Sequence, residues 1–384
     1  MDVLLDGDER QVRDQARAFF ADACPPSLVR ECEAGVKYSP DLWKAMAGLG
    51  WLDTSLAESV GGLGLPLPYL TLLFEEAGRC LAPVPFLSVM VPCLVLAKYG
   101  APHHEKFLKQ AMTGDLLLSF AFQEADGAWS LEGIQMVGRV EGDAVLLNGT
   151  KMFVDNFAIS GRCLVAFRGD GEKSGLTLAL VDTAARGLSH LDLVATAKDS
   201  HSLVRFENVR VPLADIVGEI GGANHAIAEA MDLATLLVTA QLAGAARKAA
   251  EFAIEYAKER IAFEQPLGSF QAVQHLCADM IIGVDGAELL CREASWKLAQ
   301  GMEGASEISQ AKAFANDKCV MACRAAQQIH GGIGFIMEFD LQLWYRRVVS
   351  WSLRYGTTAE HRRRVADHLL SRSGKIRLDR NAPA

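Results

Sequence analysis

The spacing of apolar residues changes twice along this 384-residue chain, and these changes constrain the fold more than any other feature. From residue 8 to about 115, apolar side chains recur every three or four positions, which predicts helices. From about 116 to 215 the period falls to two, in short runs separated by turn signals such as Glu141-Gly142-Asp143. From about 222 onward the spacing is again helical, over the long stretches 223–260, 269–300 and 306–330.

This pattern predicts an α+β protein with three domains. We place an N-terminal helical domain at residues 1–115, a central antiparallel β barrel or sandwich at 116–218, and a C-terminal helical bundle domain at 219–384. The expected strands are 116–122, 134–140, 144–149, 163–168, 175–181 and 202–211.

Composition excludes several classes of protein. The chain has 38 basic and 47 acidic residues, a net charge of −9, so we expect no nucleic-acid partner. The nine cysteines form no CxxC pair, and no His or Cys spacing typical of a metal site accompanies them, so we expect no metal and a reducing compartment. The acidic first ten residues lack signal-peptide character, and the apolar stretches 86–97 and 234–246 are too short to span a bilayer. We therefore predict a cytoplasmic protein with no membrane insertion.

Three segments carry chemistry-bearing residues. Gly331-Gly332-Ile333-Gly334 follows a helix that ends at His330, and such glycines either terminate the helix or let a flat or anionic ligand approach the backbone. Arg260 ends a long helix, where it is either a surface cation or a bidentate partner for a phosphate. The segment 149–156, GTKMFVDN, is a strand that enters a polar loop or a plain hairpin turn.

Taken in this order, the three segments resemble the acyl-CoA dehydrogenase family. NGTKMFVDN resembles the family's NGxKxWITN, RIAFEQPLGSFQAVQ resembles RxxFGxxIxxFQxxQ, and QQIHGGIGFIMEFDLQLWYRR resembles QxxGGxGY with the helix that follows it. The resemblance implies helices, a β barrel and a four-helix bundle, with FAD bound at the subunit interfaces of a tetramer. It also implies oxidation of an acyl-CoA thioester to its α,β-enoyl form, with an electron-transfer flavoprotein or a similar acceptor collecting the electrons.

The resemblance carries over to particular positions. Residues that match the family's FAD-binding positions are Arg260, Phe263, Gln271, Gln328, Gly331 and Gly332. Phe122, Gln123 and Glu124 match the strand end that runs beside the flavin. Phe153 stands where the family usually has a tryptophan that packs on the flavin, Asp155 where it usually has a threonine, and Gly356-Thr357 matches the pair that follows the usual catalytic glutamate.

The chain departs from the family at the catalytic base. The glutamate position before Gly356 holds Tyr355, and the alternative glutamate position on the long helix holds Ala234. A phenol with a pKa of ~10 is a poor base at neutral pH, so Tyr355 is either a strongly shifted base or a packing residue, and Asp155 is a second weak candidate. Glu264 replaces the glycine usual after Phe263, and Trp129 replaces a small polar residue.

These departures leave three interpretations. The first is an FAD-dependent acyl-CoA dehydrogenase-type subunit that works with a paralogous subunit carrying the base, as in the family's heteromeric members for large ring-bearing acyl-CoA substrates. The expected pathway is fatty-acid catabolism or the catabolism of steroid and other ring side chains. The second is a flavin-dependent oxidase or monooxygenase on the same fold. The third is a non-catalytic paralogue that acts as a structural subunit.

Overall fold

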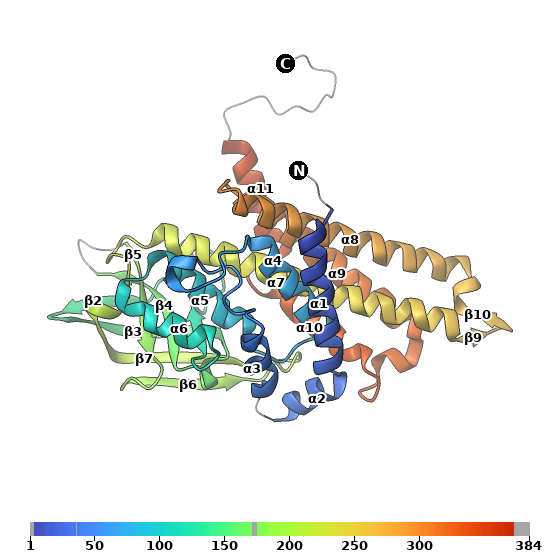
Figure 1. Cartoon of the computed structure of the whole chain (residues 1–384), viewed down its shortest axis with the longest axis horizontal. Coiled ribbons are helices and arrows are strands. Elements are labelled where there is room, and N and C mark those ends of the chain that lie inside the picture. The colour runs from blue at the N-terminus through green and yellow to red at the C-terminus, as the bar shows by residue number, and fades with distance from the viewer. Residues whose placement is uncertain (1–3, 36, 171–174, 372–384) are drawn as a thin grey trace, which may run out of the picture.

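The computed structural model describes residues 4–35, 37–170 and 175–371 (Figure 1). Its N-terminal part is helical, and two helix starts follow directly from the sequence. Asp6 and Glu9 form a reciprocal capping box at the start of α1, and Ser39 caps α3 just before Pro40. The six α-helices of this part are α1 (Gly7–Ala23), α2 (Pro26–Ala34), α3 (Pro40–Gly48), α4 (Leu67–Arg79), α5 (Phe86–Tyr99) and α6 (Glu105–Met112).

The middle of the chain forms one eight-stranded sheet in the order β6-β7-β3-β2-β4-β5-β8, with β1 also paired to β4. Its strands are β1 (Leu118–Ala121), β2 (Val137–Glu141), β3 (Ala144–Asp155), β4 (Arg162–Gly169), β5 (Leu176–Asp182), β6 (Leu188–Leu193), β7 (His201–Pro212) and β8 (Ile216–Val217). All six expected strands are present. The sheet is mixed rather than purely antiparallel, because β1 and β2 both pair with β4 in parallel.

Two strands of this sheet were missed by the sequence pattern. The side chains of β6 are exposed or half-buried along its whole length, so the strand lacks the alternation that reveals a half-buried strand. Strand β8 has only two residues. Strand β6 is nevertheless important for the candidate residue Asp155. It pairs with β7, and the register of β7 on β3 places His201 opposite Asp155.

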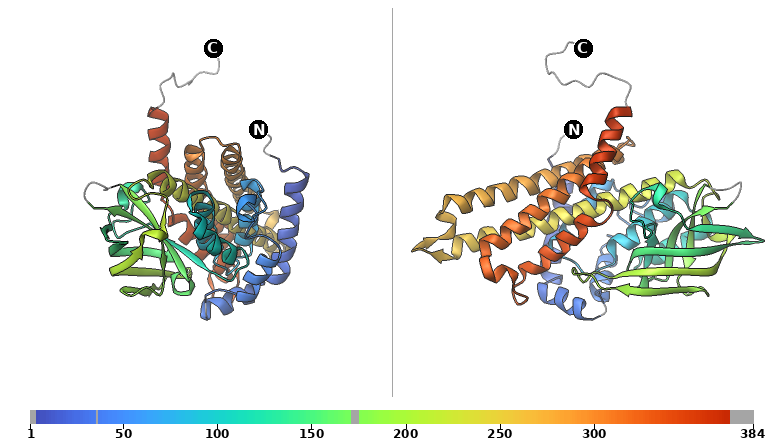
Figure 2. Two further views of the ribbon diagram at one scale, coloured as in Figure 1. Left: turned by 60° about the vertical axis from the view of Figure 1, so that its left-hand side comes forward. Right: turned by 180° about the vertical axis from the view of Figure 1, so that it is seen from behind.

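Long helices follow the sheet and extend away from it (Figure 2). They are α7 (Asn224–Glu259), α8 (Gln271–Ala299), α9 (Ala305–His330), α10 (Leu341–Leu353) and α11 (Thr358–Ser371). A small hairpin, β9 (Ile261–Ala262) with β10 (Gln265–Pro266), joins α7 to α8 at the far end, and the 3-10 helix η8 (Gly331–Phe335) follows α9. Further single-turn 3-10 helices lie at 58–60, 102–104, 131–133, 157–159, 213–215 and 267–269.

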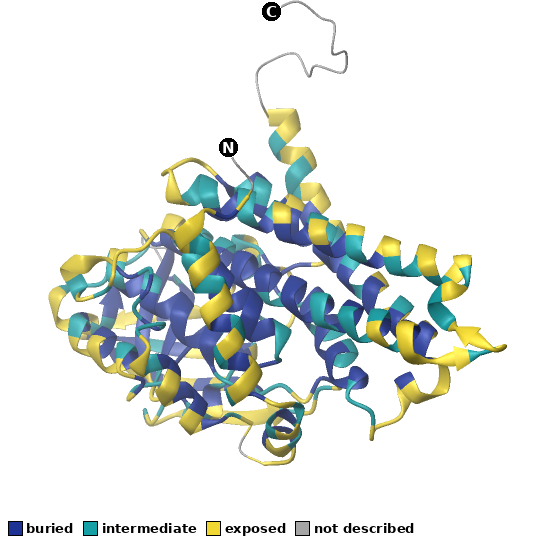
Figure 3. Cartoon of the chain, turned by 45° about the vertical axis from the view of Figure 1, so that its right-hand side comes forward, coloured by how far each residue is buried: buried dark blue, intermediate teal, exposed yellow. Residues whose placement is uncertain are grey.

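Helix α7 is the centre of the fold. Its length and apolar composition would suffice for a membrane span, but 78% of its most apolar window is buried within the protein, as in the core helix of a globular protein (Figure 3). Helix α4 packs unusually close to it. A Cβ on Gly78 would lie 2.0 Å from the carbonyl oxygen of Gln241, and one on Gly244 would lie 1.8 Å from that of Glu75, so both positions require glycine.

The hydrophobic core has two parts. The larger part joins the N-terminal helices to α7, α8, α9 and α10, and it includes Trp129 and Tyr355. The smaller part lies within the sheet. The helices before residue 115, the strands between 118 and 217 and the helices after 224 follow the expected order. The exact domain limits at 115/116 and 218/219 remain our proposal, and residues 1–3 and 372–384 of the predicted domains lie outside the described residues.

Candidate functional site

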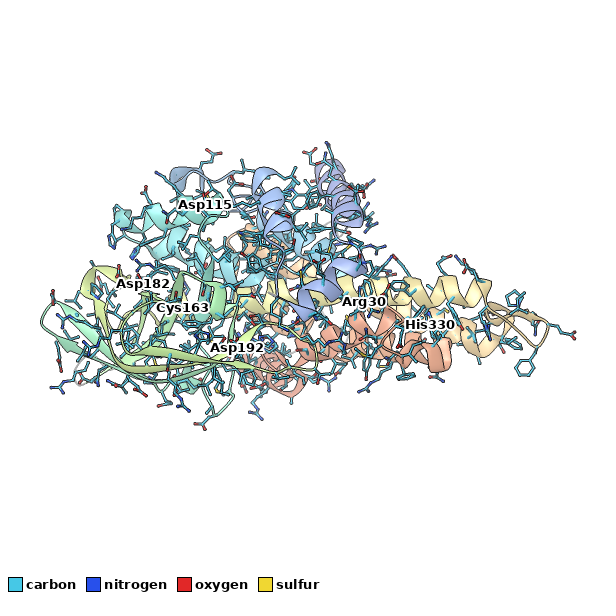
Figure 4. The ribbon with its side chains drawn as sticks, turned by 90° about the horizontal axis from the view of Figure 1, so that it is seen from below. Arg30, Asp115, Cys163, Asp182, Asp192 and His330 are labelled. Carbon is cyan, nitrogen blue, oxygen red and sulfur yellow. The ribbon has the colours of Figure 1, made fainter. Side chains whose placement is uncertain are left out.

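The residues singled out by the sequence fall into two groups that the chain does not bring together. One group surrounds Asp155 and Tyr355, where the sheet meets the helices. The other lies at the far end of α7, α8 and α9, beside the β9–β10 hairpin (Figure 1). In Figure 4, Cys163 and Asp182 are labelled in the sheet and His330 is labelled out along the long helices, next to the glycines of the second group. Within one copy of the chain, the two groups therefore form separate surfaces.

Asp155, the last residue of β3, is held by three side chains. Its Oδ1 accepts a hydrogen bond from Nδ1 of His201 at 2.7 Å and another from Arg354 at 3.0 Å. Its Oδ2 accepts from Arg354 at 3.1 Å and from the hydroxyl of Tyr355. Both carboxylate oxygens are therefore occupied by donors from β7 and from the end of α10. The sequence pointed to Asp155 and Tyr355, whereas His201 and Arg354 are identified only by this geometry.

These contacts fix the protonation states. Burial opposes ionisation of Asp155, but the charge of Arg354 and the hydrogen bond from His201 outweigh it and hold the pKa of Asp155 well below its usual range. For Tyr355, burial and then the adjacent Asp155 carboxylate raise the pKa well above 10. Asp155 is a saturated carboxylate and Tyr355 a protonated phenol. Both groups are therefore engaged within the chain, and a role of either as the general base stays a prediction.

Aromatic rings fill the space on the other side of Tyr355. The ring of Trp129 meets that of Tyr355 edge-on at 4.9 Å between centroids, and Phe120 lies 6.0 Å away. The indole Nε1 of Trp129 donates to Oγ1 of Thr235 at 3.1 Å, which fixes the ring against α7. Ala234, the alternative base position, is buried and carries no ionisable group. Trp129 thus occupies interior space that a small residue would leave open.

The residues expected beside the flavin are used in contacts within the chain. Glu124 forms an ion pair with the fully buried Lys151 at 2.6 Å and accepts hydrogen bonds from the backbone of Gln135 and Met136. Burial lowers the pKa of Lys151 to about 8. Gln123 donates to the carbonyl of Gly127, and Phe122 is buried. Thr357 and Glu360 form a reciprocal capping pair at the start of α11.

Backbone strain accumulates at this site. Phe153, Asn156 and Tyr355 adopt φ values of 51°, 55° and 58°. Such angles are unfavourable for bulky residues and persist only where the surroundings enforce them. Phe153 is also partly exposed, and the Arg354 guanidinium lies 5.8 Å from the centre of its ring.

The second group forms an open, polar surface at the tip of the long helices. Among the described residues, the exposed guanidinium of Arg260 has no hydrogen bond or ion pair. Gln271 begins α8, and Gln328 lies on the exposed side of α9. Gly331 has φ 64°, and a Cβ at Gly331 or Gly332 would meet no atom within 4 Å. A free cation, two amides and an unobstructed glycine backbone fit the phosphate and sugar parts of a nucleotide.

The hairpin beside this surface is strained as well. Phe263 and Glu264, the two residues between β9 and β10, have φ values of 53° and 66°. A turn with two positive φ angles normally takes Asn-Gly or a similar pair. The Phe263 side chain is 89% exposed. Glu264, which replaces the usual glycine, therefore holds a conformation that glycine would adopt without cost.

One cluster elsewhere has the residue types of a metal site. Ligand atoms of His103, His104 and Asp215 lie within 4.8 Å of one another. However, Nδ1 of His104 accepts a hydrogen bond from the backbone N–H of Ala101, so the neutral ring carries its proton on Nε2. Burial lowers the pKa of His104 to about 4, which keeps the ring neutral. This tautomer offers no lone pair to a metal at Nε2.

The comparisons with known proteins agree with the fold and with the motifs. The acyl-CoA dehydrogenase N-terminal domain matches residues 6–115, and the acyl-CoA dehydrogenase C-terminal domain matches residues 221–370. The chain belongs to the acyl-CoA dehydrogenase family. Members of this family are flavin-dependent oxidoreductases that act on CH–CH bonds, and we assign this type of chemistry and flavin use to the chain.

Three relatives illustrate the range of the family. The 3-(aryl)acrylate reductase of Clostridium sporogenes is 29% identical over 372 residues, which cover 94% of this chain and 97% of that protein. Subunit CarC of the caffeyl-CoA reductase-Etf complex of Acetobacterium woodii is 27% identical, with 94% and 98% covered. The ChsE4-ChsE5 complex of Mycobacterium tuberculosis has the same fold, with a TM-score of 0.90, 24% identity, and 97% and 100% covered.

Proposed function

We propose that this chain is one subunit of a heteromeric, FAD-dependent acyl-CoA dehydrogenase-type enzyme whose paralogous subunit supplies the catalytic base. The observation that carries the proposal is the state of Asp155 and Tyr355. The carboxylate is saturated by donors, the phenol is protonated, and Ala234 has no ionisable group. The usual base positions therefore provide no proton acceptor.

A base is a requirement of the reaction. The α-proton of an acyl thioester is weakly acidic, and a positioned general base contributes about 10²–10⁴-fold to the rate of its removal. When bound, FAD supplies the acceptor for the β-hydride. A chain that lacks the base but keeps groups suited to the cofactor is consistent with a site completed by a second type of subunit.

The surface at the tip supports a role in holding the nucleotide part of FAD. Arg260 is free to pair with a phosphate, Gly331 and Gly332 leave their backbone accessible, and Gln271 and Gln328 offer amide donors. Exposed apolar side chains flank this surface, and another subunit would cover them: Ile261, Phe263, Ile333, Phe335, Ile336 and Met337. We therefore propose a tetramer in which this surface faces a neighbouring subunit.

A cavity among the N-terminal and long helices supports the same division. It has a volume of about 910 Å³ and lies between α5, the first half of α7 and the α8–α9 connection. Its lining carries three carboxylates, Glu229, Asp232 and Glu303, but one lysine, Lys98. Lys98 is already paired with Glu229, and Arg364 is paired with Asp232, so among the described residues the lining leaves no lysine or arginine free for the anionic phosphates of coenzyme A. We propose that the acyl-CoA substrate binds mainly to the paralogous subunit.

The substrate class and the electron acceptor are proposed from the relatives. The 3-(aryl)acrylate and caffeyl-CoA reductases act on aromatic compounds, and the latter is a complex with Etf. We propose a ring-bearing acyl group as the substrate and an electron-transfer flavoprotein as the electron acceptor. We place the assembly in the cytoplasm.

The test is expression of the chain alone and together with a paralogous subunit, followed by sizing, flavin quantification and a dehydrogenase assay on a panel of acyl-CoAs. We expect the chain alone to retain little FAD and to be inactive. The co-expressed complex should contain FAD and be active. A yellow homotetramer that is fully active by itself would refute the proposal, and rapid oxygen consumption by that homotetramer would favour an oxidase.

Variants locate the cofactor contact within the complex. Arg260→Gln should weaken FAD affinity by about tenfold and so lower FAD occupancy after dialysis, because a charge-assisted contact to a phosphate contributes on the order of 1.5 kcal/mol. Arg139→Gln is the matched control, since Arg139 is exposed in β2 at the opposite end of the molecule. Equal FAD occupancy in the two variants would show that Arg260 does not bind the cofactor.

A further inference from the structure

Lys312 is a fully buried lysine that the candidate site does not use. It lies on α9, and its Nζ donates a hydrogen bond to the backbone carbonyl of Trp351 at 2.7 Å. Trp351 belongs to the last turn of α10, where a helix leaves its carbonyl groups without partners of its own. Lys312 therefore joins the bundle to the end of the helix that precedes Arg354 and Tyr355.

Two further side chains hold the connection between α10 and α11, residues 354–357. Asn316, one turn further along α9, donates from Nδ2 to the carbonyl of Gly356 at 3.3 Å. On α11, Nε2 of His361 lies 2.9 Å from the carbonyl oxygen of Tyr355, to which it donates. Side chains of α9 and α11 thus fix neighbouring carbonyl groups of one short connection.

The connection is strained, and it ties the helices to the sheet. Tyr355 has a φ of 58°, which a bulky residue keeps only where contacts enforce it. Its hydroxyl and the guanidinium of Arg354 both donate to Asp155 at the end of β3. Loss of the contacts from α9 would therefore let the connection relax and would release the donors that saturate Asp155.

Lys312 has no ion pair within the described part of the chain. The hydroxyl that α7 directs at the connection, that of Thr235, is neutral. Burial, more than any charge nearby, lowers the pKa of Lys312 to about 7. The titratable and charged groups around it are Cys319 on α9, Glu288 on α8, which faces Cys319 in turn, Arg354 beyond α10, and His361 on α11.

The closed connection would satisfy a protonated Lys312 poorly. An ammonium group has three N–H donors, and the carbonyl of Trp351 accepts one of them. The buried Oδ1 of Asn316 has no hydrogen-bond partner among the described residues either. Unsatisfied polar groups are costly in a protein interior, and water would reach both of these groups if the connection opened.

We propose that the α10–α11 connection is a proton-operated latch, closed on the bundle while the amine of Lys312 is neutral and biased toward a water-filled open state once that amine takes up a proton from solvent. The opening is local, because α9 stays packed against α7 and α8 through its other buried residues. The inference goes beyond the proposed division of the flavin site and does not depend on it.

The working range of the latch follows from the two states of Lys312. In the open connection the hydrated amine has its ordinary pKa of ~10.4, whereas in the closed connection its pKa is about 7. Between these values the open state binds the proton and the closed state does not, so opening increases about tenfold for each pH unit by which the pH falls. Below about pH 7 both states are protonated, and the dependence ends.

The experiment is hydrogen–deuterium exchange of the full chain in its native assembly at about pH 7, 8 and 9, with each rate divided by that of an unstructured peptide at the same pH. We expect protection of the segment 350–361 to rise about tenfold per pH unit, and protection of β4 to change much less. Tyr355 and His361 do not interfere, because their pKa values lie well above 10 and at about 4. Constant protection of 350–361 would show that the closed connection accommodates the ammonium, and equal changes in both segments would show a global titration. Either result would overturn the latch.

Lys312→Met removes the titratable group and keeps most of the length of the side chain. We expect this variant to show the same protection of 350–361 at all three pH values. Lys318→Met is the matched control, because Lys318 lies on the same helix with a half-buried side chain, and it should keep the pH dependence. Glu75, whose pKa is about 8, lies on α4 in all three proteins and cannot cause a difference between them. A pH dependence retained in folded Lys312→Met would contradict the proposal, and if that variant does not fold, the pH series of the unmodified chain decides by itself.

Discussion

Replacing Asp155 by asparagine separates a structural role from a catalytic one. The side chain keeps its size but loses the charge that balances the guanidinium of Arg354, which is mostly buried. Removing one partner of a buried ion pair costs about 3–5 kcal/mol, because the remaining charge stays desolvated. Arg354 would keep the carbonyl of Phe153 and the Tyr355 hydroxyl as neutral partners, so we expect a loss of unfolding free energy near the lower limit, about 3 kcal/mol.

The effect should depend on pH in a defined direction. The pKa of Asp155 is lower in the folded chain than in the unfolded chain, where it is ~3.9. The carboxylate therefore stabilises the fold above that unfolded-state pKa, and the contribution is lost as pH falls toward the folded-state value. The difference in stability between the unmodified chain and Asp155→Asn should be full at pH 7 and shrink below about pH 4.

The assay is chemical unfolding followed by circular dichroism, in the same assembly state, at a series of pH values. Asp143→Asn is the control, since Asp143 is almost fully exposed and should change stability by less than about 0.5 kcal/mol. The reasoning would be refuted if Asp155→Asn left stability unchanged but reduced turnover of the reconstituted complex by a hundredfold or more. That result would identify Asp155 as the base.

Two further predictions concern the interior. Burial, followed by repulsion from Glu288, raises the pKa of Glu75 to about 8, so the unfolding free energy of the unmodified chain should fall as pH rises from about 4.5 to 8. Glu75→Gln should flatten this decline in melting temperatures measured between pH 5 and 9, and an unaltered profile would argue against the burial of an ionising Glu75. Tyr355→Phe keeps the packing on Trp129 and removes two hydrogen bonds, one donated to Asp155 and a longer one accepted from Arg354, so we expect a cost of about 1–2 kcal/mol and less than a tenfold change in turnover of the complex. A loss of several orders of magnitude in turnover, with the fold intact, would make the phenol a proton carrier in the reaction.

Much of the architecture follows from local patterns in the sequence. The long helices have apolar residues at helical spacing and clear ends, so the expected 223–260, 269–300 and 306–330 agree with α7, α8 and α9 within a few residues. The strands that bury alternate side chains, such as β7, were predicted as well. Patterns of this kind are local because a helix or a strand selects which face to bury by the spacing of its own residues.

The sequence also identified Asp155, Tyr355 and the tip residues as positions of interest, but it could not give their environments. His201 and Arg354 lie 46 and 199 residues from Asp155, and no local pattern links them. The parallel pairing of β1 and β2 with β4 likewise depends on how distant segments cross. From the sequence alone, an aspartate at position 155 could act as a general base or as a carboxylate whose oxygens are all taken up by hydrogen-bond donors. Which of them Asp155 becomes depends on the donors and the burial that the tertiary structure places around it, because those surroundings set its pKa and occupy its lone pairs.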